Sequence, residues 1–140
     1  MRESGILLPV FCLPSPNGIG CFSKEAYRWV DFLEKAGQKY WQILPLGPTS
    51  FGDSPYQSFS TYAGNPYFID LEQLAAQGLL KRSEVRKCDC GLKEQDIDYG
   101  KLYRNRMPLL KKAYGRSLEK EDPEFTQFRK ENGAWLDDYC

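Results

Sequence analysis

The first forty-six residues carry the hydrophobic pattern of a strand, a helix and a second strand. The continuous apolar run over residues 5–11 predicts a strand buried on both faces, because such a strand needs no alternation with polar positions. A helix is predicted over 24–36, with Ser23 as its N-cap and Gly37 as its end. Its apolar face consists of Ala26, Trp29, Val30 and Leu33. Residues 40–46 predict a second strand, and the crossover through the helix makes the two strands parallel.

The segment from Gly47 to Tyr67 has neither helical nor alternating periodicity. Glycine, proline, serine and asparagine occur throughout it, which is typical of turns. Loops of this length are uncommon in compact domains and usually serve a function. In parallel α/β folds, ligands bind at the carboxyl ends of the strands, and this loop directly follows the second strand. We therefore expect it to carry the functional site.

The remaining residues predict helices. The first covers 71–77, the second covers 99–115 with Asp98 as its cap and an interruption at Pro108, and the last begins near Pro123. The apolar stripe of this last helix consists of Phe125, Phe128, Trp135, Leu136 and Tyr139. Because the stripe still continues at the final residue without a C-cap, we expect the chain to be truncated.

Composition restricts the classes of function. The 140 residues carry 19 basic and 19 acidic side chains, 41% are hydrophobic and 27% are charged, as in an ordinary globular domain. No apolar run approaches the length of a membrane span. The balanced charge gives no excess of basic side chains of the kind that binds nucleic acid. The chain has no histidine, which excludes Ser-His and Cys-His nucleophile pairs and the usual zinc sites. Acid–base chemistry would therefore require carboxylates.

The five cysteines form no recognisable framework. Cys88 and Cys90 are separated by one residue, whereas redox and zinc-ribbon pairs have two intervening residues. We therefore expect free thiols in a reducing cytoplasm and no metal.

The chemistry of the loop is that of a site for a neutral, polyhydroxylated ligand. Between Tyr40 and Ile69 the only charged residue is Asp53, while eight of the chain's twenty aromatic residues lie there. Aromatic rings can cover the apolar face of a sugar, and hydroxyl, amide and carboxylate groups can bind its hydroxyls. A phosphate ligand would require lysine or arginine, which this stretch lacks.

Two alternatives remain open at this point. Each aromatic residue could belong to the core, with the glycines and prolines forming plain turns. Asp53 could be a catalytic acid, an acceptor for a sugar hydroxyl or a structural cap of the loop. The last two roles are favoured, because a retaining glycosidase needs two carboxylates about 5 Å apart and this region offers one.

Several segments resemble one known family. These are residues 2–9, 13–20, 40–49, 52–60, 98–100 and 135–139, of which the run from Tyr40 to Asn65 is the most specific. They resemble the amino-terminal region of the amylomaltases, the 4-alpha-glucanotransferases of glycoside hydrolase family 77. The resemblance implies an α/β fold, namely the first part of a (β/α)8 barrel. Residues 1–140 would supply its first two strands, a substrate loop over 47–67 and a helical insertion over about 70–140.

The resemblance also implies an activity. The family transfers segments of α-1,4-glucan to the 4-hydroxyl of an acceptor sugar by a retaining mechanism, without a cofactor. Its partners are α-1,4-glucans and maltooligosaccharides. Its three catalytic carboxylates would lie beyond residue 140, so we expect this segment alone to be inactive. The alternatives are a non-catalytic glucan-binding or remnant protein that is complete at residue 140, and a structural module without sugar binding.

The site residues implied by the resemblance lie in and near the loop. Ser54 and Tyr56 match positions that line the donor sugar subsites, with Asp53 beside them. Phe51 and Tyr103 match two aromatic residues at a second, more remote glucan site. Phe51 stands where a tyrosine is common, so the ring face is kept and the phenol hydroxyl is lost.

Overall fold

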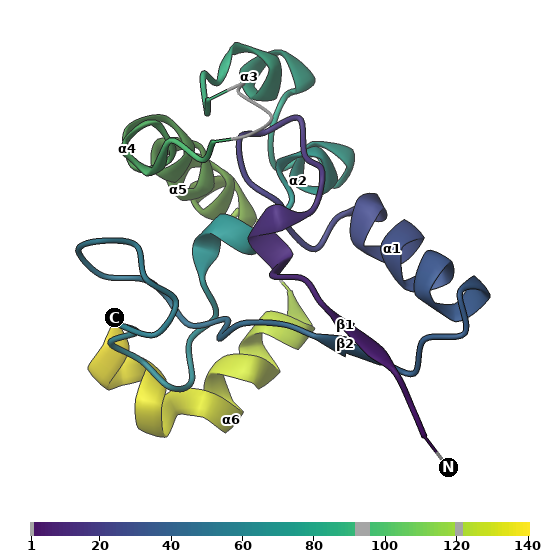
Figure 1. The fold of residues 1–140 in the computed structure, drawn as a ribbon. Coiled ribbons are helices and arrows are strands. Elements are labelled where there is room, and N and C mark those ends of the chain that lie inside the picture. The colour runs from purple at the N-terminus through teal and green to yellow at the C-terminus, as the bar shows by residue number, and fades with distance from the viewer. Residues whose placement is uncertain (1, 92–95, 120–121) are drawn as a thin grey trace.

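The computed structural model describes residues 2–91, 96–119 and 122–140. Strand β1 (Gly5–Leu7) pairs in parallel with β2 (Tyr40–Gln42), in a register that places Ile6 opposite Trp41. Helix α1 (Lys24–Lys35) connects them (Figure 1). The predicted parallel strand–helix–strand unit is therefore confirmed.

The ends of α1 are those that the sequence predicts. The Ser23 hydroxyl accepts the backbone N–H of Glu25 at 3.2 Å, and Gly37 follows the helix with a φ of 69°. On the predicted apolar face, Ala26 and Leu33 are buried. Val30, on the same face, is exposed.

Both strands are shorter than predicted. The ladder extends only to the bond from the Leu8 N–H to the Gln42 carbonyl. After Pro9 the chain turns into the 3₁₀ helix η1 (Val10–Cys12). The expectation of burial on both faces is also wrong for β1, whose Leu7 is exposed.

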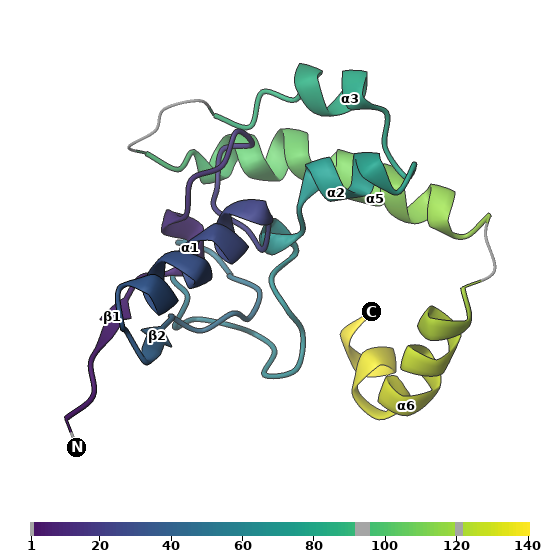
Figure 2. The same cartoon turned by 90° about the vertical axis from the view of Figure 1, so that its right-hand side faces the viewer.

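Helices occupy most of the chain after residue 70. They are α2 (Leu71–Ala76), α3 (Arg82–Lys87), α4 (Tyr99–Lys101), the π-helical segment η3 (Leu102–Arg106), α5 (Met107–Ser117) and α6 (Pro123–Tyr139). The predicted helices over 71–77, over 99–115 and from Pro123 are thus confirmed. Figure 2 shows α6 set apart from α2, α3 and α5. Among the described residues, none of these helices is long and apolar enough to cross a membrane.

Helix α3 is missing from the sequence-based prediction. Its six residues contribute one buried side chain, Val85, so no apolar periodicity indicates it. The helix is fixed instead by Glu84, which accepts the Lys81 N–H at 2.8 Å and two guanidinium bonds from Arg116 at 2.8 and 3.0 Å. Arg116, Lys112 and the Lys81 N–H hold the pKa of the Glu84 carboxyl well below its usual range.

The interruption expected at Pro108 takes the form of a π-helical segment. Proline lacks an N–H and its ring would clash with a carbonyl four residues earlier, at Arg104. The chain widens just before it, and the Met107 N–H bonds the Leu102 carbonyl five residues back. The segment ends at Arg106, whose side chain is fully buried.

Arg106 joins three separate parts of the chain. Its Nη1 donates to the carbonyl of Asn17 at 3.2 Å, and its Nη2 donates to the carbonyls of Tyr67 at 3.0 Å and Ile69 at 2.6 Å. Burial lowers the pKa of the Arg106 guanidinium. The contacts fix η3 to the loop after β1 and to the end of the predicted substrate loop.

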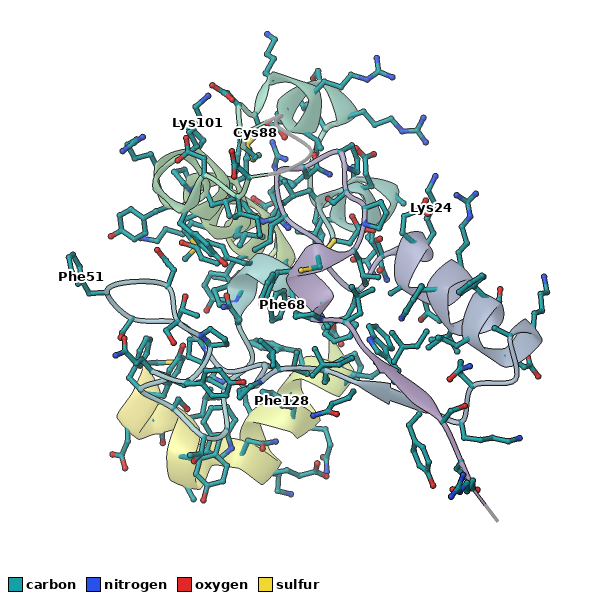
Figure 3. The ribbon with its side chains drawn as sticks, in the orientation of Figure 1. Lys24, Phe51, Phe68, Cys88, Lys101 and Phe128 are labelled. Carbon is teal, nitrogen blue, oxygen red and sulfur yellow. A yellow bond between two sulfur atoms is a disulfide. The ribbon has the colours of Figure 1, made fainter. Side chains whose placement is uncertain are left out.

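The apolar core consists of two clusters. The larger lies between the helices after residue 70 and contains Ile19, Tyr67, Leu71, Leu80, Val85, Cys90, Leu102 and Ala113. The smaller contains Val10, Leu13 and Ala26, and joins α1 to the strands. Phe68, at the centre of Figure 3, packs against both clusters and so connects them.

The prediction of free thiols is wrong for two of the five cysteines. Cys88 and Cys90 form a disulfide (Figure 3). The Cys90 N–H bonds the Cys88 carbonyl at 3.1 Å, and this tight turn brings the two Cα atoms to 5.6 Å, within the range of disulfides. Cys12, Cys21 and Cys140 are free, as expected.

Replacement of Arg106 tests the importance of its contacts. We expect Arg106→Met to lower the free energy of unfolding by roughly 3 kcal/mol, because three carbonyls lose charged hydrogen-bond donors. Arg104→Met, at an exposed position of the same segment, is the control and should change it by less than about 0.5 kcal/mol. Urea unfolding followed by tryptophan fluorescence measures both. Equal effects of the two substitutions would contradict this account.

Thiol counting tests the disulfide. In protein purified without reductant, we expect the exposed Cys12 and Cys140 to react quickly with an aromatic disulfide reagent. Cys21 should react only after denaturation, because burial raises the pKa of its thiol. The total is then three thiols, rising to five after reduction. Five reactive thiols without reduction would rule out the Cys88–Cys90 bond.

Candidate functional site

The predicted substrate loop leaves the sheet after β2 and forms an irregular hairpin. Its base is closed by the Asn65 N–H, which donates to the Leu46 carbonyl at 2.8 Å. Between this base and the tip of the loop, Thr49 and Ser58 form an antiparallel bridge. A Cβ atom on Gly47 would lie 2.3 Å from the Ser58 hydroxyl, so the two sides approach closely because position 47 has no side chain.

Two consecutive turns build the tip of the loop. The Asp53 N–H bonds the Ser50 carbonyl, and the Gln57 N–H bonds the Ser54 carbonyl, both at 3.1 Å. Between them Asp53 adopts a φ of 54°, a left-handed conformation that aspartate tolerates better than most residues. The tight turns place Phe51 at the outer end of the loop, where its side chain is fully exposed (Figure 3).

Ser54 and Tyr56 lie together in the second turn. The Ser54 hydroxyl accepts the backbone N–H of Tyr56 at 3.4 Å. The Tyr56 side chain is 72% exposed, and no ring of the described residues stacks on it. The structure thus ties the Ser54 hydroxyl to the backbone of Tyr56 and leaves the Tyr56 ring open to solvent. The interpretation of Tyr56 as a core residue is wrong.

Asp53 keeps free acceptor capacity. Thr49 Oγ1 lies 3.5 Å from Asp53 Oδ1, a long hydrogen bond that leaves the carboxylate with capacity to accept others. Burial raises the pKa of Tyr67 and of Tyr99, and the Asp53 charge raises both further.

Tyr103 lies outside the loop, on η3, and is 69% exposed. The other four predicted site residues, Phe51, Asp53, Ser54 and Tyr56, share the turns at the loop tip. Figure 1 shows the loop tip on the same side of the molecule as α4, which directly precedes η3. The structure thus brings four of the five together in one loop and places the fifth on the helical segment that follows α4.

The support of the loop by α6 was not predicted from the sequence. Phe59 stacks on Tyr139 with ring centroids 6.0 Å apart, and Tyr62 stacks on Trp135 at 5.6 Å. The sequence shows the aromatic stripe of α6 but gives no partner for it, since more than seventy residues separate the paired rings. Both rings thus contact α6, but Phe59 and Tyr62 remain 64% and 72% exposed, so neither is a core residue.

The site is built for binding through rings and neutral polar groups. In the part of the chain that the structure describes, no three histidine, cysteine, aspartate or glutamate side chains gather to hold a metal ion. A parallel β–α–β unit followed by an exposed loop rich in aromatic and hydroxyl side chains defines an α/β protein with a candidate carbohydrate-binding surface.

Comparison with known proteins gives the family. The profile of the 4-alpha-glucanotransferase family matches residues 8–140. The 4-alpha-glucanotransferase of Streptococcus pneumoniae is 50% identical over 137 residues, which are 97% of this chain and 27% of that protein. The 4-alpha-glucanotransferase of Thermus thermophilus is 48% identical, over 99% of this chain and 28% of that protein.

A solved structure of similar fold supports the same family assignment. The amylomaltase from Streptococcus agalactiae in complex with acarbose superposes with a TM-score of 0.92 at 42% identity, covering 99% of this chain and 28% of that one. The chain belongs to the 4-alpha-glucanotransferase family. It spans about a quarter of the length of the relatives that it matches.

Proposed function

We propose that the chain is the amino-terminal portion of a 4-alpha-glucanotransferase and supplies part of its glucan-binding surface. In this proposal residues 1–140 contribute the first two strands of a (β/α)8 barrel, the substrate loop over 47–67 and a helical insertion over about 70–140. The parallel pairing of β1 with β2 through α1 supports it, because this is the repeating unit of such barrels. The loop then lies at the barrel face where ligands bind.

The proposed reaction moves a segment of α-1,4-glucan to the 4-hydroxyl of an acceptor sugar. In a retaining mechanism a carboxylate displaces the leaving sugar and forms a covalent glycosyl intermediate, and the acceptor hydroxyl then breaks that bond. An acid–base carboxyl first protonates the leaving oxygen and later takes the proton of the acceptor. We place these carboxylates beyond residue 140 and assign none of their roles to Asp53.

The residues of the loop would bind and orient the donor glucan. The open ring of Tyr56 offers a surface for the apolar face of a sugar, and the neighbouring Ser54 hydroxyl can bind a sugar hydroxyl. Asp53 retains acceptor capacity for a further hydroxyl. Phe51 and Tyr103, both exposed, would form a second contact with a long glucan further along the same side.

The observation that carries this proposal is the exposure of Tyr56 and Phe51 in a loop that lies within the family match. A second candidate is glucan binding without catalysis. It is favoured by the presence of one carboxylate in the loop where a retaining enzyme needs two. The two candidates share the binding surface and differ only in turnover.

Substitution of Tyr56 tests the binding surface. We expect Tyr56→Ala to weaken the binding of maltoheptaose about tenfold, or ~1.4 kcal/mol, because the sugar loses its aromatic platform. Tyr27→Ala, which removes an equally exposed tyrosine from α1, should leave the affinity unchanged. Isothermal titration calorimetry measures both. If both variants bind like the wild type, the site lies elsewhere.

An assay of maltotriose disproportionation separates the two candidates at the level of this chain. We expect the 140-residue protein to release no glucose and form no longer oligosaccharides, because the catalytic carboxylates are placed beyond it. A full-length amylomaltase serves as the positive control. Turnover by this chain would show that carboxylates within residues 1–140 suffice for the reaction.

A further inference from the structure

We infer that α6 positions the substrate loop, and that Trp135 and Tyr139 are positioning residues for glucan binding. They act through Tyr62 and Phe59, which lie on the returning side of the hairpin. The inference rests on the proposed function, since it assigns to these rings the task of holding Ser54 and Tyr56 ready for the sugar.

The contact between α6 and the loop consists of two parallel ring stacks. The planes of Phe59 and Tyr139 lie within 9° of each other, and those of Tyr62 and Trp135 within 19°. Offset stacking of this kind stabilises a pair beyond the area that it buries. In Figure 1 the end of α6 lies next to the loop, in agreement with these contacts.

The helix side of the contact is held by bonds within α6. The Trp135 indole N–H donates to Asn132 Oδ1 at 2.9 Å, and Asn132 Nδ2 in turn donates to the Phe128 carbonyl at 2.9 Å. The ring of Phe128 meets Trp135 edge-on, with centroids 6.5 Å apart. The orientation of Trp135 is therefore restrained by its own helix as well as by Tyr62.

The loop side has few restraints of its own. Between residues 59 and 64, hydrogen bonds among the described residues come from local serine turns, in which Ser60 Oγ accepts the N–H groups of Tyr62 and Ala63 at 3.3 and 3.0 Å. These bonds shape the chain locally but attach it to nothing else. The stacks on α6 are thus what fixes this part of the hairpin in space.

The position of the returning side determines that of the binding residues. Ser58 immediately precedes the stacked segment and pairs with Thr49 across the hairpin, and the tip turns with Ser54 and Tyr56 lie between these two residues. A loop held in its binding conformation loses less entropy when the ligand binds. Loss of the α6 stacks should therefore weaken glucan binding although no α6 residue touches the sugar.

A double-mutant cycle on Tyr62 and Trp135 tests the inference. We expect Tyr62→Ala and Trp135→Ala each to weaken maltoheptaose binding about three- to tenfold, and the double variant to be no weaker than the single ones. Trp135→Phe keeps a ring for the stack and should bind within about twofold of the wild type. Phe125→Ala is the matched control, because it removes from α6 a ring that makes no stack among the described residues. The inference would be overturned if the loss of affinity in the double variant equalled the product of the two single losses. It would also be overturned if Trp135→Ala bound maltoheptaose like the wild type.

Hydrogen exchange separates this inference from the proposed function. In Trp135→Ala the amides of residues 59–65 should exchange at least several-fold faster than in the wild type and in Phe125→Ala, with the far-ultraviolet circular dichroism unchanged. Unchanged exchange rates would refute the positioning role. Faster exchange in a protein that binds no maltoheptaose would support the positioning role and refute the proposed function.

Discussion

The arrangement of the site depends on one buried guanidinium. Arg106 is removed from solvent and donates to the carbonyls of Asn17, Tyr67 and Ile69, which belong to two segments far apart in the sequence. A charge in the interior is costly unless polar groups surround it, so the carbonyls and the arginine stabilise one another. Because the bonds go to backbone atoms, they fix the path of the chain and leave the loop side chains free to face solvent. This is how a segment with little regular structure can present a defined surface.

The loop itself combines two kinds of support. Its base is rigid, since Asn65 bonds Leu46 and Tyr67 is held by Arg106. Its tip is determined by short turns and by the stacking of Phe59 and Tyr62 on α6. The ring faces of Phe51 and Tyr56 are left open. The proposed glucan contact needs such open rings, and in our inference the aromatic residues stacked on α6 keep them in place.

The elements that the sequence predicts correctly are those with local signals. Ser23 and Asp122 identify the starts of α1 and α6 because a cap is a contact between neighbours in the chain. The lengths of β1 and β2 were overestimated, since an apolar run does not reveal where pairing stops. Helix α3 was missed because its stability depends on Glu84 and Arg116, which are thirty-two residues apart.

The candidate site could be located from composition and family resemblance, but its support could not. The loop and its single carboxylate, Asp53, were selected because the stretch is poor in charge and rich in rings, whereas Ser54 and Tyr56 were selected from the family resemblance. Nothing in the pattern distinguishes Arg106 from the exposed Arg104 two residues earlier, and nothing pairs Trp135 with Tyr62. Such contacts depend on how distant segments meet in three dimensions. The Cys88–Cys90 bond likewise depends on a turn that the spacing of the two residues does not reveal.

The π-helical turn before Pro108 has a consequence for how the helix containing it tolerates change in length. A π turn holds about one residue more than an α turn, so η3 has the form of a single-residue insertion in a continuous helix. Because the wider turn spreads one full rotation over about one residue more, the helix holds the extra residue without changing the rotational phase of its two ends. Arg106 therefore still faces the loops while Ala113 faces the core. Deleting one residue there would keep that phase but return Pro108 to a regular α turn, in which its ring meets the carbonyl four residues earlier. The segment thus separates the length of the helix from the direction in which its two ends face.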